Sequence, residues 1–210
     1  MDLSIGRRMK KEYEIVSDEA VFRGFFKMNR YRLRHSSFHG GWCGEIVRER
    51  IEHLAAVSVL LYDPDLDILV LVEQFRVGLM GNADPPWSLE TVSGFCDTDH
   101  EAAEEVARRE VVEETDCTLK ALTHVGEFFV SPGMSVERIN LYCGWVDASR
   151  AGGIHGLDHE GEELRVVTMS RSEALGALFG RLRSTSIIMA LQWLEANRPR
   201  LLTEWGWQPA

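Results

Sequence analysis

A glycine-containing loop leads into a carboxylate-rich segment at residues 94–117, and this segment restricts the possible folds more than any other. Its letters are GFCDTDHEAAEEVARREVVEETDC. Alanine and valine recur among Glu and Arg at helical spacing, which predicts a helix over about residues 101–115, with Asp99 or His100 as its N-terminal cap. The apolar stripe of such a helix packs on a core, so the protein needs a sheet or further helices to cover it.

Two carboxylates of this predicted helix are placed to share a cation. Glu110 and Glu114 are four residues apart and therefore lie on one face, where their oxygens suit a hard ion such as Mg2+. Arg109 and Glu113 have the same spacing next to that face, so the arginine can pair with carboxylates and hold them in position. The alternative is a solvated helix with ion pairs along its surface, which is the commoner explanation of a Glu-rich helix.

The rest of the chain predicts a mixed α/β domain with a small N-terminal sheet. Short alternating patterns at 21–35 and 45–51 indicate half-exposed strands. The apolar segments LAAVSVLLY and DILVLVEQF flank the turn at 63–67 and predict a hairpin in the core. Later strands are expected in THVGEFFV, RINLYCGWV and LRVVTM, with a Gly-rich acidic loop at 151–163. Helices are expected at about 170–180, where Ser170 and Glu173 form a capping box, and at about 186–198, ended by Pro199.

Composition excludes several classes of function. The chain has 23 Lys and Arg against 33 Asp and Glu, and a net charge of -10 argues against a broad nucleic-acid surface. Its 4 cysteines form no C-x-x-C pair, so reduced thiols in the cytoplasm are expected and a zinc site is not. No apolar run approaches the ~18 residues of a membrane span, and the basic N-terminus lacks the apolar stretch of a signal peptide. We therefore expect a cytoplasmic protein that binds neither nucleic acid nor membrane.

The charged positions of 94–117 resemble the Nudix box, G-x5-E-x7-R-E-U-x-E-E-x-G-U, where U is aliphatic. The matching positions are Glu101, Arg109, Glu110, Glu113 and Glu114, with Val112 as an aliphatic neighbour. The sequence departs from the box twice. Gly94 lies one residue too far upstream of Glu101, and Asp116 followed by Cys117 replaces the final glycine and aliphatic residue. Because Asp tolerates left-handed backbone angles better than most residues, we expect the helix to end there as a glycine would allow.

Segments outside the box also resemble Nudix hydrolases, in particular bacterial members that cleave ADP-ribose. These segments are RGFF at 23–26, YDP at 62–64, EQFR at 73–76, PW at 86–87, SPG at 131–133, SVER at 135–138, GIHGL at 153–157 and MALQWL at 189–194. The resemblance implies a Nudix fold, a mixed sheet sandwiched between helices with a small N-terminal antiparallel sheet. It also implies a homodimer in which residues 1–50 are swapped onto the partner's hydrolase domain, 51–210.

The same resemblance implies a set of site residues. Metal ligands would be the main-chain carbonyl of Ser93 and the carboxylates of Glu110, Glu114 and Glu162, holding about two or three Mg2+ ions, with Mn2+ as an alternative. Glu160 would be the general base, supported by Arg109 and Glu113. Phe25 and Arg48 would contact the adenine end and Arg76 a phosphate. Further substrate contacts would come from Glu49, Ser131, Gly133 and Glu137.

The implied reaction is Mg2+-dependent hydrolysis of the ADP-ribose pyrophosphate to AMP and ribose 5-phosphate. Cations are needed because an acidic protein must approach two linked phosphates, and Glu160 would take a proton from the attacking water. Two alternatives remain open. One is a hydrolase of another nucleoside diphosphate sugar, such as GDP-mannose, and the other is a non-catalytic nucleotide-sensing Nudix domain. Without the resemblance, Phe25 could be a core residue, and the acidic loop and the exposed side of residues 45–51 could be merely solvated.

Overall fold

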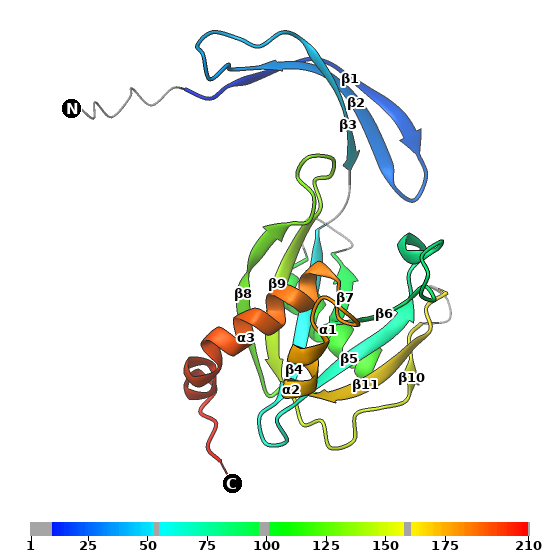
Figure 1. The fold of residues 1–210 in the computed structure, drawn as a ribbon, viewed down its shortest axis with the longest axis vertical. Helices are drawn as coiled ribbons and strands as arrows, with labels where there is room; N and C mark the ends of the chain where they lie inside the picture. The colour runs from blue at the N-terminus through cyan, green and yellow to red at the C-terminus, as the bar shows by residue number, and fades with distance from the viewer. Residues whose placement is uncertain (1–9, 53–54, 97–100, 158–160, 210) are drawn as a thin grey trace, which may run out of the picture. The chain divides into compact units, whose positions relative to one another are not determined.

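The computed structural model describes residues 10–52, 55–96, 101–157 and 161–209, and Figure 1 shows its fold. The chain divides into two compact units. One comprises Phe129–Glu137 and the described residues of Met1–His53. The other comprises the described residues of Leu54–Phe128 and Arg138–Ala210.

The first unit is a three-stranded antiparallel sheet in the order β1 (Tyr13–Arg23), β2 (Lys27–His35) and β3 (Ile46–Glu52). The predicted N-terminal sheet is therefore confirmed, although the alternating pattern at 21–35 did not indicate residues 13–20 of β1. The loop at 129–137 is tied to β3, since Ile51 and Ser135 form a β-bridge. Most side chains of the three strands are exposed, and apolar ones are among them.

The second unit is built on an eight-stranded mixed sheet, whose main path runs β10-β11-β5-β4-β9-β8. Its strands are β4 (Ala56–Asp63), β5 (Ile68–Phe75), β6 (Trp87–Glu90), β7 (Val92–Phe95), β8 (Ala121–Phe129), β9 (Arg138–Trp145), β10 (Ile154–His155) and β11 (Leu164–Ser170). The predicted hairpin is β4 and β5, and β4 runs parallel to β9. All eight residues of β4 are buried, as its continuous apolar run requires.

The sheet divides where strands β4 and β5 of the hairpin separate, and we call this division the fork. β4 and β5 pair only where residues 61–63 meet 68–70. Beyond that point β6 pairs with β5 and β7 pairs with β4. Between β6 and β7, Thr91 lies 2.7 Å from the hydroxyl of Ser58, both groups being buried.

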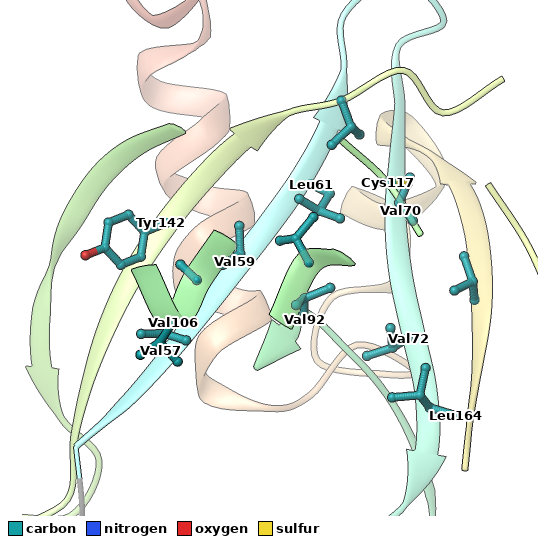
Figure 2. Close-up of a cluster of buried hydrophobic side chains, with 14 of the residues drawn as sticks. Val57, Val59, Leu61, Val70, Val72, Val92, Val106, Cys117, Tyr142 and Leu164 are labelled. Atoms are coloured by element: carbon teal, nitrogen blue, oxygen red, sulfur yellow. The ribbon is translucent and has the colours of Figure 1, made fainter. Parts of the chain in front are cut away.

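Helices cover both faces of the sheet, and strand alternation assigns them. On one face, Val57 and Val59 of β4 share an apolar cluster with Val106 and Val111 of α1 (Ala103–Thr115), as Figure 2 shows for Val57, Val59 and Val106. On the other, Leu60 joins residues of α2 (Arg171–Ala177) and α3 (Thr185–Glu204). Figure 1 shows α3 crossing the sheet in orange and red. The predicted mixed sheet between helices is confirmed.

The observed helix ends match some of the caps that the sequence predicted. Asp116 ends α1 with φ 53° in the left-handed region, as predicted, and Ser170 and Glu173 form the expected capping box on α2. The cap prediction for α1 was wrong: its N-cap is Ala102, without a side-chain cap, while Asp99 and His100 lie outside the described residues.

Pro199 lies inside α3 and does not end it, contrary to prediction. Leu201 and Leu202, beyond the proline, are buried against the sheet, and this burial favours a helix that continues past it. Within the described residues, no helix combines the length and apolar character that a bilayer crossing requires.

Candidate active site

Helix α1 packs against β7 and buries the carboxylates that the sequence placed on one of its faces. Glu110 is 9% exposed and Glu114 only 1%. Water is therefore not what stabilises these two groups, since burying an ionised carboxylate is costly unless a partner compensates. The solvated-helix interpretation does not fit these two side chains.

Glu114 lies among other charged groups. The backbone N–H of Ser93 donates to its Oε2 at 3.4 Å, while its Oε1 is buried without a hydrogen-bond partner among the described residues. Burial raises the pKa of Glu114 well above its usual value, and repulsion from Glu162 and Glu110 raises it further. The Ser93 N–H and the charge of Arg76 offset only part of this rise. Glu110, Glu114 and Glu162 thus act on one another electrostatically, and the charge of Arg76 reaches the same group.

Two glycines allow close packing against Glu110 and Glu162, one against a carboxylate and one against a backbone carbonyl. A Cβ atom on Gly94, in β7, would lie 2.0 Å from Oε1 of Glu110, so only glycine leaves that carboxylate its place. Gly156 has φ +110°, and a Cβ there would lie 2.5 Å from the backbone oxygen of Glu162. The glycine that starts the box and the second glycine of GIHGL therefore both serve close packing at this cluster.

Arg109 makes the ion pairs that the helical spacing predicts. Its Nη1 lies 2.9 Å from Oε2 of Glu113 and 3.0 Å from Oε1 of Glu110, and its Nε is 3.9 Å from Glu101. Burial lowers the pKa of this guanidinium, but Glu110 and Glu113 outweigh that effect and raise it. The arginine therefore pairs with the same carboxylate oxygen of Glu110 that lies close to Gly94, and helps to hold it in place.

Arg76 immediately follows β5, at the end where β5 pairs with β6 and no longer with β4. Its Nε and Nη2 donate to Oε2 of Glu90, at 3.1 and 2.9 Å, and its side chain remains 40% exposed. Glu90 was not singled out from the sequence, because a single carboxylate at the end of a short apolar segment carries no distinguishing pattern. Glu90 orients the Arg76 guanidinium through Nε and Nη2, and the remaining N–H donors of the guanidinium are available to an anion.

Six predicted substrate-binding residues belong to the unit of β1–β3. Phe25 is 83% exposed in the turn between β1 and β2 and packs edge-on against Phe26, so it is not a core residue. Arg48 and Glu49 are exposed on β3, where Glu49 pairs with Arg30 at 2.7 Å. Ser131, Gly133 and Glu137 lie in the loop attached to that sheet. The predicted base, Glu160, lies outside the described residues.

The donor set suits a hard divalent cation. Among the described residues, no three acidic, His or Cys side chains are already arranged as a complete set of metal ligands. Like-charged carboxylates repel one another until a cation lies among them, so incomplete convergence is expected of the side chains alone. The unpartnered Oε1 of Glu114 and the space that Gly94 leaves for Glu110 both fit an ion with oxygen ligands, as Mg2+ and Mn2+ prefer.

Comparison with known proteins gives consistent matches over the chain. The family model described as NUDIX domain matches residues 52–186. ADP-ribose pyrophosphatase of Escherichia coli (strain K12) is 39% identical over 198 residues, covering 94% of each chain. The Haemophilus influenzae protein of the same name is 36% identical over 93% of this chain and 92% of its own.

More distant matches have the same extent. GDP-mannose pyrophosphatase of Cronobacter sakazakii is 32% identical over 89% of this chain and 97% of its own. A crystal structure of an ADP compounds hydrolase superposes with a TM-score of 0.69 at 20% identity, covering 90% of this chain and 96% of that one. At that identity the structural match bears on the fold alone, and it confirms the predicted fold.

Proposed function

The chain belongs to the Nudix family and is an enzyme that acts on pyrophosphate bonds, and we propose that its substrate is ADP-ribose, cleaved to AMP and ribose 5-phosphate. The observation that carries the chemistry is the buried Glu114, which Glu110 and Glu162 repel and whose Oε1 has no hydrogen-bond partner within the described ranges. The choice of substrate is supported by the 39% identity to an ADP-ribose pyrophosphatase over nearly the full length of both chains.

The proposed cofactor is Mg2+, with Mn2+ as an alternative, held by the carbonyl of Ser93 and the carboxylates of Glu110, Glu114 and Glu162. When bound, such ions neutralise phosphate charge and make a water molecule more acidic. Arg109 keeps Glu110 in place through its 3.0 Å contact. Arg76 supplies a cationic fork for a phosphate, oriented by Glu90. Glu160 is proposed as the group that takes the proton from water.

A second copy of the chain is proposed as the partner. Large apolar side chains are exposed on the sheet of β1–β3 and its turns, and exposed apolar patches of this kind mark interfaces. They are Tyr13, Ile15, Val16, Phe22, Phe26, Phe38, Trp42 and Val47. In the proposed swapped dimer, Phe25 and Arg48 of one copy contact the adenine end of the substrate bound by the other.

Replacing Gly94 by alanine is expected to lower kcat about a hundredfold while the protein stays folded. The added methyl group must displace the carboxyl end of Glu110, and a misplacement of about 1 Å can cost that much. Steady-state kinetics and thermal unfolding measure the two effects. Gly176→Ala is the control, because its Cβ position in α2 is open. Wild-type turnover of Gly94→Ala would remove Glu110 from the proposed site.

One incubation tests the substrate. Purified protein is given ADP-ribose with Mg2+, with and without EDTA, and the products are separated. AMP and ribose 5-phosphate are expected only where free Mg2+ is present. GDP-mannose is assayed in parallel, because the 32% identical relative favours it as the second candidate. A higher kcat/KM for GDP-mannose would replace the proposed substrate, and tight binding of ADP-ribose without product would favour a sensor. Size-exclusion chromatography of the same sample measures whether the chain is a dimer.

A further inference from the structure

Gln74 is a buried polar residue that the proposed chemistry leaves without a function. It lies on β5 and is 5% exposed, and its side-chain Nε2 has no hydrogen-bond partner among the described residues. A buried amide nitrogen without an acceptor is unfavourable, and native proteins seldom retain one. Its presence therefore indicates that an acceptor arrives from outside the described chain.

The strand register places Gln74 on the face of the sheet that carries the carboxylates. Side chains alternate along β5, so Gln74 shares a face with Val72, and the extended backbone of Arg76, the residue after β5, continues the alternation. Val72 belongs to the apolar cluster that α1 covers, and Arg76 acts electrostatically on Glu114. Gln74 is paired with Ser88 of β6 and with Leu164 of β11, which comes two residues after Glu162. The amide therefore lies next to Arg76 on the wall of the proposed site.

Two buried polar atoms near this wall, one from Glu114 and one from Gln74, call for opposite kinds of ligand atom. Oε1 of Glu114 is an acceptor and Nε2 of Gln74 is a donor, yet neither has a partner in the part of the chain that the structure describes, so they do not satisfy each other. A cation would satisfy the carboxylate oxygen. An anionic oxygen would satisfy the amide, because an NH2 group donates two hydrogen bonds and is neutral. A pyrophosphate with its metal ions brings both at once.

We propose that Gln74 is a further substrate-binding residue, whose Nε2 donates to a non-bridging oxygen of the pyrophosphate next to the phosphate that Arg76 contacts. The inference rests on the proposed function and adds a residue to the same site. Arg76 supplies charge from a partly exposed position, whereas Gln74 supplies a directional donor from the buried wall. A neutral donor at that depth binds an oxyanion without competing with the metal ions for the carboxylates.

The test compares Gln74→Met with wild type in three measurements. These are Mg2+-supported hydrolysis of ADP-ribose, calorimetric binding of its non-hydrolysable methylene-bridged analogue, and thermal unfolding. Methionine preserves size and removes the donor, so the protein should unfold at the same or a higher temperature. Binding of the analogue and kcat/KM should each fall about ten- to hundredfold, the expected loss for one hydrogen bond to a charged group. Gln192→Met, on an exposed position of α3, is the matched control and should change neither.

Each outcome decides between the claims. Analogue binding and turnover at wild-type level in Gln74→Met would overturn the inference and leave the proposed function intact. Failure of the wild type both to bind the analogue and to cleave ADP-ribose would overturn the two together. Should Gln74→Met not fold, Gln74→Glu gives the answer, because it keeps the shape, removes both donors and adds negative charge. A folded Gln74→Glu variant with wild-type kcat/KM would overturn the inference equally.

Discussion

The Glu114→Gln variant is expected to lose turnover of ADP-ribose on the order of a thousandfold while remaining folded. Glutamine keeps the shape of the side chain and the contact to the Ser93 N–H but removes the charge that would hold a cation. Glu105→Gln is the control, since Glu105 is exposed on the first turn of the same helix. Turnover within a few-fold of wild type would exclude Glu114 as a metal ligand.

Stability measurements give this variant a second readout. Burial, with repulsion from Glu162 and Glu110, raises the folded-state pKa of Glu114 above its unfolded value. The folded state then binds more protons, so this carboxyl lowers the stability of the metal-free protein as the pH rises above the ordinary carboxyl range. Glutamine does not titrate. Metal-free Glu114→Gln should therefore lose less stability than wild type on going from about pH 5 to about pH 8. Mg2+ should raise the Tm of the wild type but not that of Glu114→Gln.

The Glu160→Gln variant should lower kcat by about 10^2- to 10^4-fold, the range expected for loss of a general base. Its Mg2+-induced rise in Tm should equal that of wild type, because the proposed ligands are other residues. The acidic limb of the kcat/KM profile should disappear, since that limb reports ionisation of the base. Glu163→Gln, at an exposed position nearby, is the control. Near-normal turnover of Glu160→Gln with an unchanged pH profile would assign the base to another residue.

Together the two variants separate binding of the cation from removal of the proton. The expected pattern is a large loss of turnover in both variants, with the Tm response to Mg2+ lost only in Glu114→Gln. The same loss of the Tm response in Glu160→Gln would instead place Glu160 among the ligands. Either result would still leave the family assignment unchanged, because that rests on the match over residues 52–186.

Local patterns determined the features whose physics acts over a few residues. The spacing of Val106 and Val111 gave α1, and the ion pairs of Arg109 followed from the same periodicity. The tolerance of Asp for the left-handed region gave the end of that helix. At Pro199 the local pattern gave the wrong helix end. A local rule ends the helix there, whereas burial of Leu201 and Leu202 against a distant sheet carries it onward.

The carboxylate set came from the sequence, but its electrostatics did not. Helical spacing put Glu110 and Glu114 on one face without indicating whether water or protein covers it. Packing of α1 on β7 buries both, and it also brings the Glu110 carboxylate to within reach of Gly94. Glu90 and Gln74 belong to the wall of the site only because the fork brings β6 and β11 to β5. Burial and cross-strand neighbours depend on contacts distant in sequence, and these form only in the folded chain.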